Sequence, residues 1–295
     1  MLPCSPISSL FLLLVFLVTN CVDRVDAKKG KPKHGNPNVS TTAFPLPNQG
    51  NIPAHDPSIF FSNGSYYLFL AGEHISVHRS SSLGGPWQDW GTVLSRNSLI
   101  NKPGNSRPWA PTVIEWNSTI YCFYCVSRSS SRDSAIGVAT TTDIDEDTHS
   151  NTTYWKDHGV LLQTDGGVMS KVYPYNESNA IDPAFIADAS SNQPYLVYGS
   201  YWTDIWQVPL MPNLLSVKDP HHPDAAQLAF VPQHNTSKAR PMEGSFMTYK
   251  EPYYYLWFAH GQCCDFHRKG FPPNGQEYVT FPSCFCSNLF FLSFL

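Results

Sequence analysis

Three carboxylates occupy equivalent positions of a pattern that recurs four times along the 295-residue chain. Each unit has a defined starting residue, which is followed by a short apolar run, a polar turn and a second, more aromatic run. The four starting residues are Asp56, Ala110, Asp182 and Glu243. If equivalent positions of successive units meet in space, three acids converge, and like charges brought together shift one another's pKa values. Such a set suits acid–base chemistry; the alternative is that each Asp-Pro only caps a turn.

The chemistry that two or three carboxyl groups allow includes glycoside hydrolysis. One carboxyl group protonates the leaving oxygen, and another activates water or attacks the sugar. The sequence offers no competing Gly-x-Ser-x-Gly, phosphate-binding Gly-rich loop or His-Glu-x-x-His motif. His55, Trp109 and Asn179 each lie within three residues of a unit start, where an imidazole, a ring and an amide can contact sugar. For each of these three, the alternative is an ordinary packing or surface role.

The elements that must position these residues read as β-hairpins, because two β-rich runs flank a short polar turn in every unit. The unit starts lie 54 to 72 residues apart, a spacing that suits one propeller blade with loop insertions. A proline follows Asp56, Ala110 and Asp182, and it should hold the residue before it in extended geometry. The predicted fold is an all-β propeller with a central channel, and an ordinary β-sandwich is the alternative.

Composition narrows the class of protein further. Hydrophobic residues make up 42% of the chain, which is enough for a sizeable core. Charged residues make up only 14%, against about 25% in an average soluble protein. The formal net charge of -4 gives no basic footprint for nucleic acid. With 25 Pro and 18 Gly, a helical bundle is disfavoured.

The N-terminus predicts secretion. The apolar run from Ser9 to Val18 is too short to span a bilayer but fits the core of a signal peptide. A small-residue cleavage site at Ala27 gives a predicted signal peptide of residues 1–27, followed by a flexible segment of residues 28–50. The expected location is extracellular, with no membrane partner. Glycosylation sequons agree with this location; they begin at Asn38, Asn63, Asn117, Asn151, Asn176 and Asn235.

The cysteines predict disulfides rather than a metal site. Six of the eight cysteines follow the predicted signal peptide, as the pairs Cys122/Cys125, Cys263/Cys264 and Cys284/Cys286. An oxidising compartment favours disulfides, whose pairing the sequence leaves open. Zinc is disfavoured, because no Cys-x-x-Cys pair is matched by another at zinc spacing.

Several segments together resemble glycoside hydrolase family 43, and within it the fungal endo-1,5-α-L-arabinanases. The likeness runs from about residue 50 to about residue 278, in the family's order. It rests on His55–Pro57, Arg107–Pro111, Ser134–Ala139, Asn179–Pro183, Tyr198–Trp202 and Glu243–Gly244.

This resemblance implies a five-bladed β-propeller that hydrolyses internal α-1,5-L-arabinofuranosidic bonds of arabinan with inversion of configuration. Asp56 would be the general base, Glu243 the general acid, and Asp182 the residue that orients the acid and tunes its pKa. The resemblance implies a monomer that needs no cofactor for the chemistry, with a structural calcium ion in the channel. The implied substrate-binding residues are His55, Trp109, Asn179, Ala180, Ile181, Gly199, Ser200 and Tyr201.

Two departures from the family pattern bear on these expectations. Ser129 and Ser130 stand where bacterial relatives carry an aromatic residue and a glycine. Only four unit starts are present, so residues 51–278 read as a catalytic propeller truncated after about four blades, and residues 279–295 as an apolar tail outside the family pattern. The alternatives to an endo-arabinanase are an exo-acting α-L-arabinofuranosidase, a β-xylosidase of the same family, and an inactive sugar-binding propeller.

Overall fold

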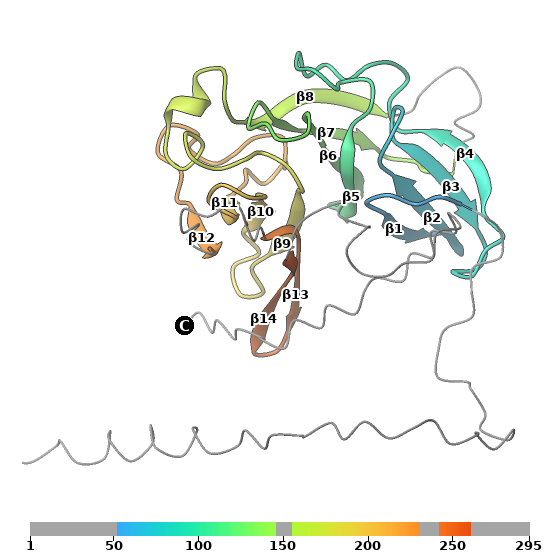
Figure 1. Ribbon diagram of the computed structural model, residues 1–295. Helices are drawn as coiled ribbons and strands as arrows, with labels where there is room; N and C mark the ends of the chain where they lie inside the picture. Colours follow the sequence, from blue (N-terminus) through green and yellow to red (C-terminus); the bar gives the residue numbers. More distant parts are fainter. Residues whose placement is uncertain (1–51, 146–154, 231–241, 261–295) are drawn as a thin grey trace, which may run out of the picture. The chain divides into compact units, whose positions relative to one another are not determined.

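The computed structural model describes residues 52–145, 155–230 and 242–260, and these residues fold into antiparallel sheets (Figure 1). The first sheet is a four-stranded meander in which each strand pairs with the next. Its strands are β1 (Ser58–Ser62), β2 (Ser65–Leu70), β3 (Ser76–Ser80) and β4 (Gln88–Thr92). This is the strand order of one propeller blade.

The pattern repeats in the following sheets. The second sheet is β5 (Trp109–Trp116), β6 (Thr119–Val126), β7 (Ala135–Thr141) and β8 (Lys156–Gln163). The third is β9 (Ala184–Ala187), β10 (Pro194–Tyr198), β11 (Ile205–Pro209) and β12 (Ala226–Ala229), preceded by a 3₁₀ helix at Met169–Lys171. A two-stranded sheet of β13 (Met242–Lys250) and β14 (Tyr253–His260) follows. The all-β prediction is confirmed.

The four predicted hairpins are the first two strands of the four sheets. The β1–β2 hairpin turns through Asn63 and Gly64, whose φ angles of 45° and 75° are those of a two-residue turn that matches strand twist. Asn117 and Ser118 make the equivalent turn between β5 and β6, with φ angles of 48° and 59°. The polar pair between two β-rich runs was therefore a sound signal for each of these two turns.

The first strands of successive sheets lie side by side. β1 packs on β5, β5 on β9 and β9 on β13. The Oγ of Ser58 in β1 accepts a hydrogen bond from the backbone N–H of Val113 in β5 at 3.1 Å. The hydroxyl of Thr112 in β5 donates to the carbonyl of Pro183, just before β9, at 2.6 Å. The first strands β1, β5, β9 and β13 are therefore neighbours in this order.

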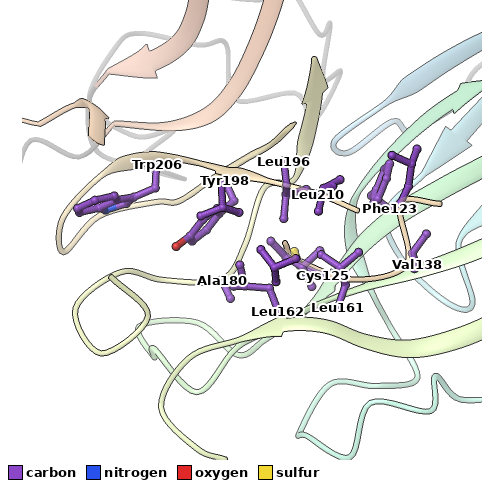
Figure 2. Close-up of a cluster of buried hydrophobic side chains, with 14 of the residues drawn as sticks. Phe123, Cys125, Val138, Leu161, Leu162, Ala180, Leu196, Tyr198, Trp206 and Leu210 are labelled. Carbon is purple, nitrogen blue, oxygen red and sulfur yellow. The ribbon is translucent and has the colours of Figure 1, made fainter. Parts of the chain in front are cut away.

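The hydrophobic core lies between successive sheets, and the side chains of β6 contribute to it on both sides. Odd-numbered residues of β6, such as Phe123 and Cys125, pack towards the third sheet, where Leu196 and Tyr198 meet them (Figure 2). Even-numbered residues, such as Cys122, pack in a separate cluster with the first sheet. Because successive side chains of a strand point to opposite faces, one strand serves both cores.

The residues before the three prolines do not have the predicted extended geometry. Asp56, Ala110 and Asp182 have φ angles of 46°, 45° and 54°, in the left-handed region. That expectation was wrong, because proline disfavours the right-handed helical region without excluding a sharp turn into the next strand. A non-glycine residue held there is strained, and such strain gathers where the surrounding structure fixes a functional group.

The prediction that cysteines form disulfides fails for the pair that the structure describes. Cys122 and Cys125 are free and fully buried. They point to opposite faces of β6, so their sulfur atoms cannot meet. Cys263, Cys264 and the pair Cys284/Cys286 lie outside the described residues, as do the predicted signal peptide and apolar tail. No helix among the described residues is long and apolar enough to cross a bilayer.

Candidate active site

The structure brings Asp56, Asp182 and Glu243 together from the starts of three different sheets. Oδ2 of Asp182 accepts a hydrogen bond from the backbone N–H of Gly244 at 3.0 Å, which ties it to the residue after Glu243. The charge of Asp56 raises the pKa of both other acids, which places all three within electrostatic reach. A β-bulge lies between Glu243 and Phe246 in β13, a device that re-aims side chains beside active sites.

Asp182 is the most perturbed of the three acids. Burial raises its pKa to about 7, and the negative charges of Asp56 and Glu243 add to this effect. The Gly244 hydrogen bond and His55 act in the opposite direction. Cys125 lies next to Asp182, and burial raises the pKa of its thiol well above that of a free thiol. Asp182 therefore holds a proton far more readily than an exposed aspartate.

Glu243 is half-buried, and burial raises the pKa of its carboxyl group. The charge of Asp56 raises the pKa further, whereas His55 and a hydrogen bond from Ser200 lower it. The Ser200 hydroxyl donates to Oε2 of Glu243 at 3.1 Å. A raised pKa lets a carboxyl group keep its proton to higher pH, which suits general acid catalysis.

Asp56 differs from the other two because water reaches it. Its side chain is 39% exposed, and its Oδ2 lies 3.1 Å from Nδ1 of His55, whose side chain is 72% exposed. The site thus combines one accessible carboxyl group with two that are shielded and have raised pKa values. This division is the one that acid–base catalysis by paired carboxyl groups requires.

The predicted substrate-binding residues divide into buried and accessible groups. The side chains of Ala180 and Ile181 pack in the hydrophobic core between the second and third sheets, and their contact with substrate stays a prediction. Asn179 is 2% exposed and is bonded within the protein. Trp109 is half-buried against the same core, and Tyr201 is also half-buried.

Gly199 positions the segment that ends in Ser200 and Tyr201. Its φ angle is 124°, and a Cβ atom there would lie 2.0 Å from the carbonyl oxygen of Asp204, so no side chain fits. Its N–H donates to the carbonyl of Ile181 at 2.9 Å, and the N–H of Tyr201 donates to that of Met242 at 3.2 Å. Gly199 therefore joins this segment to the strand start that carries Asp182, and Tyr201 joins it to the one that carries Glu243.

Sequence reasoning missed two residues of the site. Cys125, considered only as a disulfide candidate, contacts Asp182, and its thiol donates to the carbonyl of Trp109 at 3.5 Å. The alternation of β6 could have placed it on that face. Ser134 belongs to a motif used for the resemblance, but its hydrogen bond to Asn179 needs the fold.

The described residues hold no group of three or more His, Cys, Asp or Glu side chains that could bind a metal ion. The calcium ion implied by the resemblance stays a prediction. No step of the chemistry is assigned to it.

Comparison with known proteins agrees with this site. The model of Glycosyl hydrolases family 43 matches residues 50–278, which is most of the chain and spans all three acids. The chain belongs to this family. The family 43 segment thus covers all the sheets that the structure describes.

Curated fungal members of the family are similar to this chain. It is 52% identical over 238 residues to the probable arabinan endo-1,5-alpha-L-arabinosidase D of Emericella nidulans, a match that covers 81% of the chain and 60% of that protein. It is 36% identical to the arabinan endo-1,5-alpha-L-arabinosidase A of Aspergillus aculeatus, covering 78% of the chain and 64% of that protein. The chain spans about three fifths of the length of these relatives.

Solved structures confirm the β-propeller fold. The alpha-L-arabinanase of Cellvibrio cellulosa matches with a TM-score of 0.63 and 24% identity, over 72% of this chain and 67% of that one. The endo-arabinanase of Bacillus licheniformis matches with a TM-score of 0.58 and 27% identity, over 74% and 69% of the two chains. Arabinanases of this family are five-bladed propellers. The four sheets described here correspond to blades of that fold, and the predicted truncation concerns residues outside the described part.

Proposed function

We propose that this chain carries the catalytic site of a glycoside hydrolase that cleaves internal α-1,5-L-arabinofuranosidic bonds of arabinan with inversion of configuration. The observation that carries the proposal is the site itself: Glu243 and Asp182, with raised pKa values, lie in electrostatic reach of the accessible Asp56. The fungal relatives named for this activity support the choice of substrate.

In the proposed reaction Glu243 is the general acid. Its proton passes to the glycosidic oxygen as the bond from that oxygen to the anomeric carbon breaks. Asp56 accepts a proton from a water molecule, whose oxygen forms the new bond to the anomeric carbon from the opposite face. Two carboxyl groups and water complete this reaction, so it requires no cofactor.

Asp182 is proposed to keep Glu243 protonated and oriented. The charge of Glu243 raises the pKa of Asp182, and because repulsion between two charges is mutual, an ionised Asp182 raises the pKa of Glu243 in turn. The pair then titrates as a unit, and one proton remains on it at higher pH than a lone glutamate would allow. Its hydrogen bond from Gly244 holds it against the start of β13.

Substrate contact is proposed for the accessible aromatic and polar groups around the acids. Trp109 and Tyr201 offer ring faces on which the apolar side of a furanose can stack, and His55 offers a ring nitrogen beside Asp56. We propose that the surface of this site is supported, rather than lined, by the residues Asn179, Gly199 and Ser200. A neutral polysaccharide also suits a chain with few charged residues.

We further propose that the protein is secreted and monomeric. Secretion follows from the predicted signal peptide of residues 1–27 and from the six sequons. The proposed catalytic segment is residues 51–278, between the flexible segment of residues 28–50 and the apolar tail of residues 279–295. The family match over residues 50–278 supports these boundaries.

Exo-action is the second candidate, because an exo-1,5-alpha-L-arabinanase from a bovine ruminal metagenomic library matches with a TM-score of 0.60 at 25% identity. Linear 1,5-arabinan digested with the full chain distinguishes the two. Endo-attack is expected to release a range of arabino-oligosaccharides in the first minutes, measured by anion-exchange chromatography. Arabinose or one short oligosaccharide alone from the outset would establish exo-action. Binding without any release would establish a sugar-binding protein.

A further inference from the structure

A buried chain of hydrogen bonds leads from the second sheet to Glu243. The hydroxyl oxygens of Ser127 and Ser134 lie 2.7 Å apart, and the Ser134 hydroxyl donates to Oδ1 of Asn179 at 2.8 Å. Nδ2 of Asn179 donates to the carbonyl oxygen of Ser200 at 3.4 Å, and the Ser200 hydroxyl donates to Oε2 of Glu243 at 3.1 Å. The two serines at the start, Asn179 and Ser200 are each at most 3% exposed.

The direction of this chain is determined by the donors available. A serine hydroxyl has one proton, and that of Ser134 is used on Asn179, so the bond between the two serines can only be donated by Ser127. The Ser127 hydroxyl also donates to the carbonyl of Arg128 at 3.3 Å, so its proton is shared between two acceptors. Asn179 accepts through its carbonyl oxygen and donates through its amide nitrogen. The bonds from Ser127 to Asn179 thus run in one direction, and bonds of this kind strengthen one another when shielded from water. Asn179 then holds the main chain of Ser200, whose hydroxyl makes the bond to Glu243.

The last bond distinguishes the two oxygens of the Glu243 carboxyl group. Oε2 accepts the Ser200 proton, so in the protonated acid the proton sits on Oε1. Ser200 itself cannot shift easily, because Asn179 holds its carbonyl oxygen and the crowded Gly199 precedes it. The serine therefore fixes the rotation of the carboxyl group as well as the site of its proton.

We propose that Ser134, Asn179 and Ser200 form a positioning relay for the general acid: Ser200 orients Glu243 and directs its proton to Oε1, and Ser134 and Asn179 hold Ser200 in place. The inference rests on the proposed role of Glu243. It gives a function to polar side chains that are buried in the protein.

Other charged groups near Glu243 also influence its pKa, and they remain in place when Ser200 is changed. Asp56 and His55 approach from the start of β1, and Asp182 from the start of β9. Asp204, before β11, accepts a hydrogen bond from the N–H of Met242 at 3.4 Å. The residue opposite Glu243 in β14 is Ala259, which has no charge.

Among these groups only Ser200 and His55 lower the pKa of Glu243. Ser200→Ala removes a hydrogen bond that favours the ionised form, so the pKa of Glu243 should rise. The basic limb of the pH–rate profile should therefore move to higher pH. At the same time kcat should fall about ten- to a hundredfold, because the carboxyl group loses its orientation, with KM nearly unchanged.

The test compares Ser200→Ala, Ser200→Thr and Ser134→Ala in the full chain. Ser200→Thr keeps a hydroxyl and should restore both kcat and the position of the basic limb. Ser134→Ala keeps the Ser200 hydroxyl but removes a hydrogen bond that supports it, so it should lower kcat by a smaller factor. The matched control is Ser98→Ala, which removes a hydroxyl that is 5% exposed and bonded to the Tyr124 hydroxyl, outside the relay. That control should leave the pH profile unmoved.

A second readout separates the relay from the proposed function. The pKa of Glu243 is followed by NMR in protein labelled with carboxyl-¹³C glutamate, with the signal assigned through Glu243→Gln. If the wild type releases nothing from arabinan, the proposed function fails, whereas a raised Glu243 pKa in Ser200→Ala still supports the bond. If the wild type is active and neither the Glu243 pKa nor the basic limb moves in Ser200→Ala, the relay is wrong. Equal losses in Ser200→Ala and Ser98→Ala would also overturn it.

Discussion

Glu243→Gln should lower the rate of arabinan hydrolysis by about 10²- to 10⁴-fold, the usual contribution of a general acid. Glutamine has nearly the same shape and can still accept the Ser200 hydrogen bond, so the site should keep its geometry. It has no proton to give to the leaving oxygen. Calorimetric titration with a linear arabino-oligosaccharide should therefore show binding close to that of the wild type.

The matched control for this change is Glu115→Gln, which alters an exposed glutamate in β5 away from the three acids. It should be as active as the wild type. A Glu243→Gln variant that keeps more than about a tenth of wild-type activity would show that another group donates the proton.

Asp182→Asn should reduce kcat by about a hundredfold, with a much smaller effect on KM. Asparagine can still accept the hydrogen bond from Gly244, so the change removes charge while keeping the contact. The charge of Glu243 raises the pKa of Asp182. Because the repulsion between two charges is mutual, removal of the Asp182 charge should lower the pKa of Glu243. The acid then loses its proton at lower pH, and the basic limb of the pH–rate profile should move to lower pH.

This shift is opposite in sign to the one expected for Ser200→Ala, so the two variants distinguish charge repulsion from hydrogen bonding at the same carboxyl group. Asp224→Asn, an exposed aspartate before β12, is the control and should leave the profile unchanged. A basic limb that stays in place in Asp182→Asn would mean that Asp182 does not tune the acid.

Much of the fold could be predicted from the first two strands of each sheet. β1, β2, β5 and β6 have β-rich sequences with clear turns between them. The outer strands have weaker signals: β4 has a single large hydrophobic residue, Trp90, and β12 is only four residues long. Strands of this kind are held by pairing with a neighbour, and a single sequence does not show that pairing.

The three acids could also be predicted, since the repeat in the sequence aligns them at equivalent positions of three units. Their environment could not. The left-handed backbone at Asp56 and Asp182 depends on contacts between sheets, as does the approach of Cys125 to Asp182. The bond from Ser200 to Glu243 joins residues 43 positions apart in sequence, on different sheets. Such contacts arise only when the sheets assemble.

In the proposed reaction Asp56 acts through water while Glu243 donates a proton. In such an inverting pair the carboxyl groups stand about 6.5–9.5 Å apart, against about 5–5.5 Å in a retaining pair. The stereochemistry of the first product tests this most directly. The full chain is mixed with linear arabinan oligosaccharide in an NMR tube, and the anomeric proton signals are followed before mutarotation. With inversion, the new reducing end should appear first as the β-anomer. Initial appearance of the α-anomer would contradict it and make Asp56 a nucleophile.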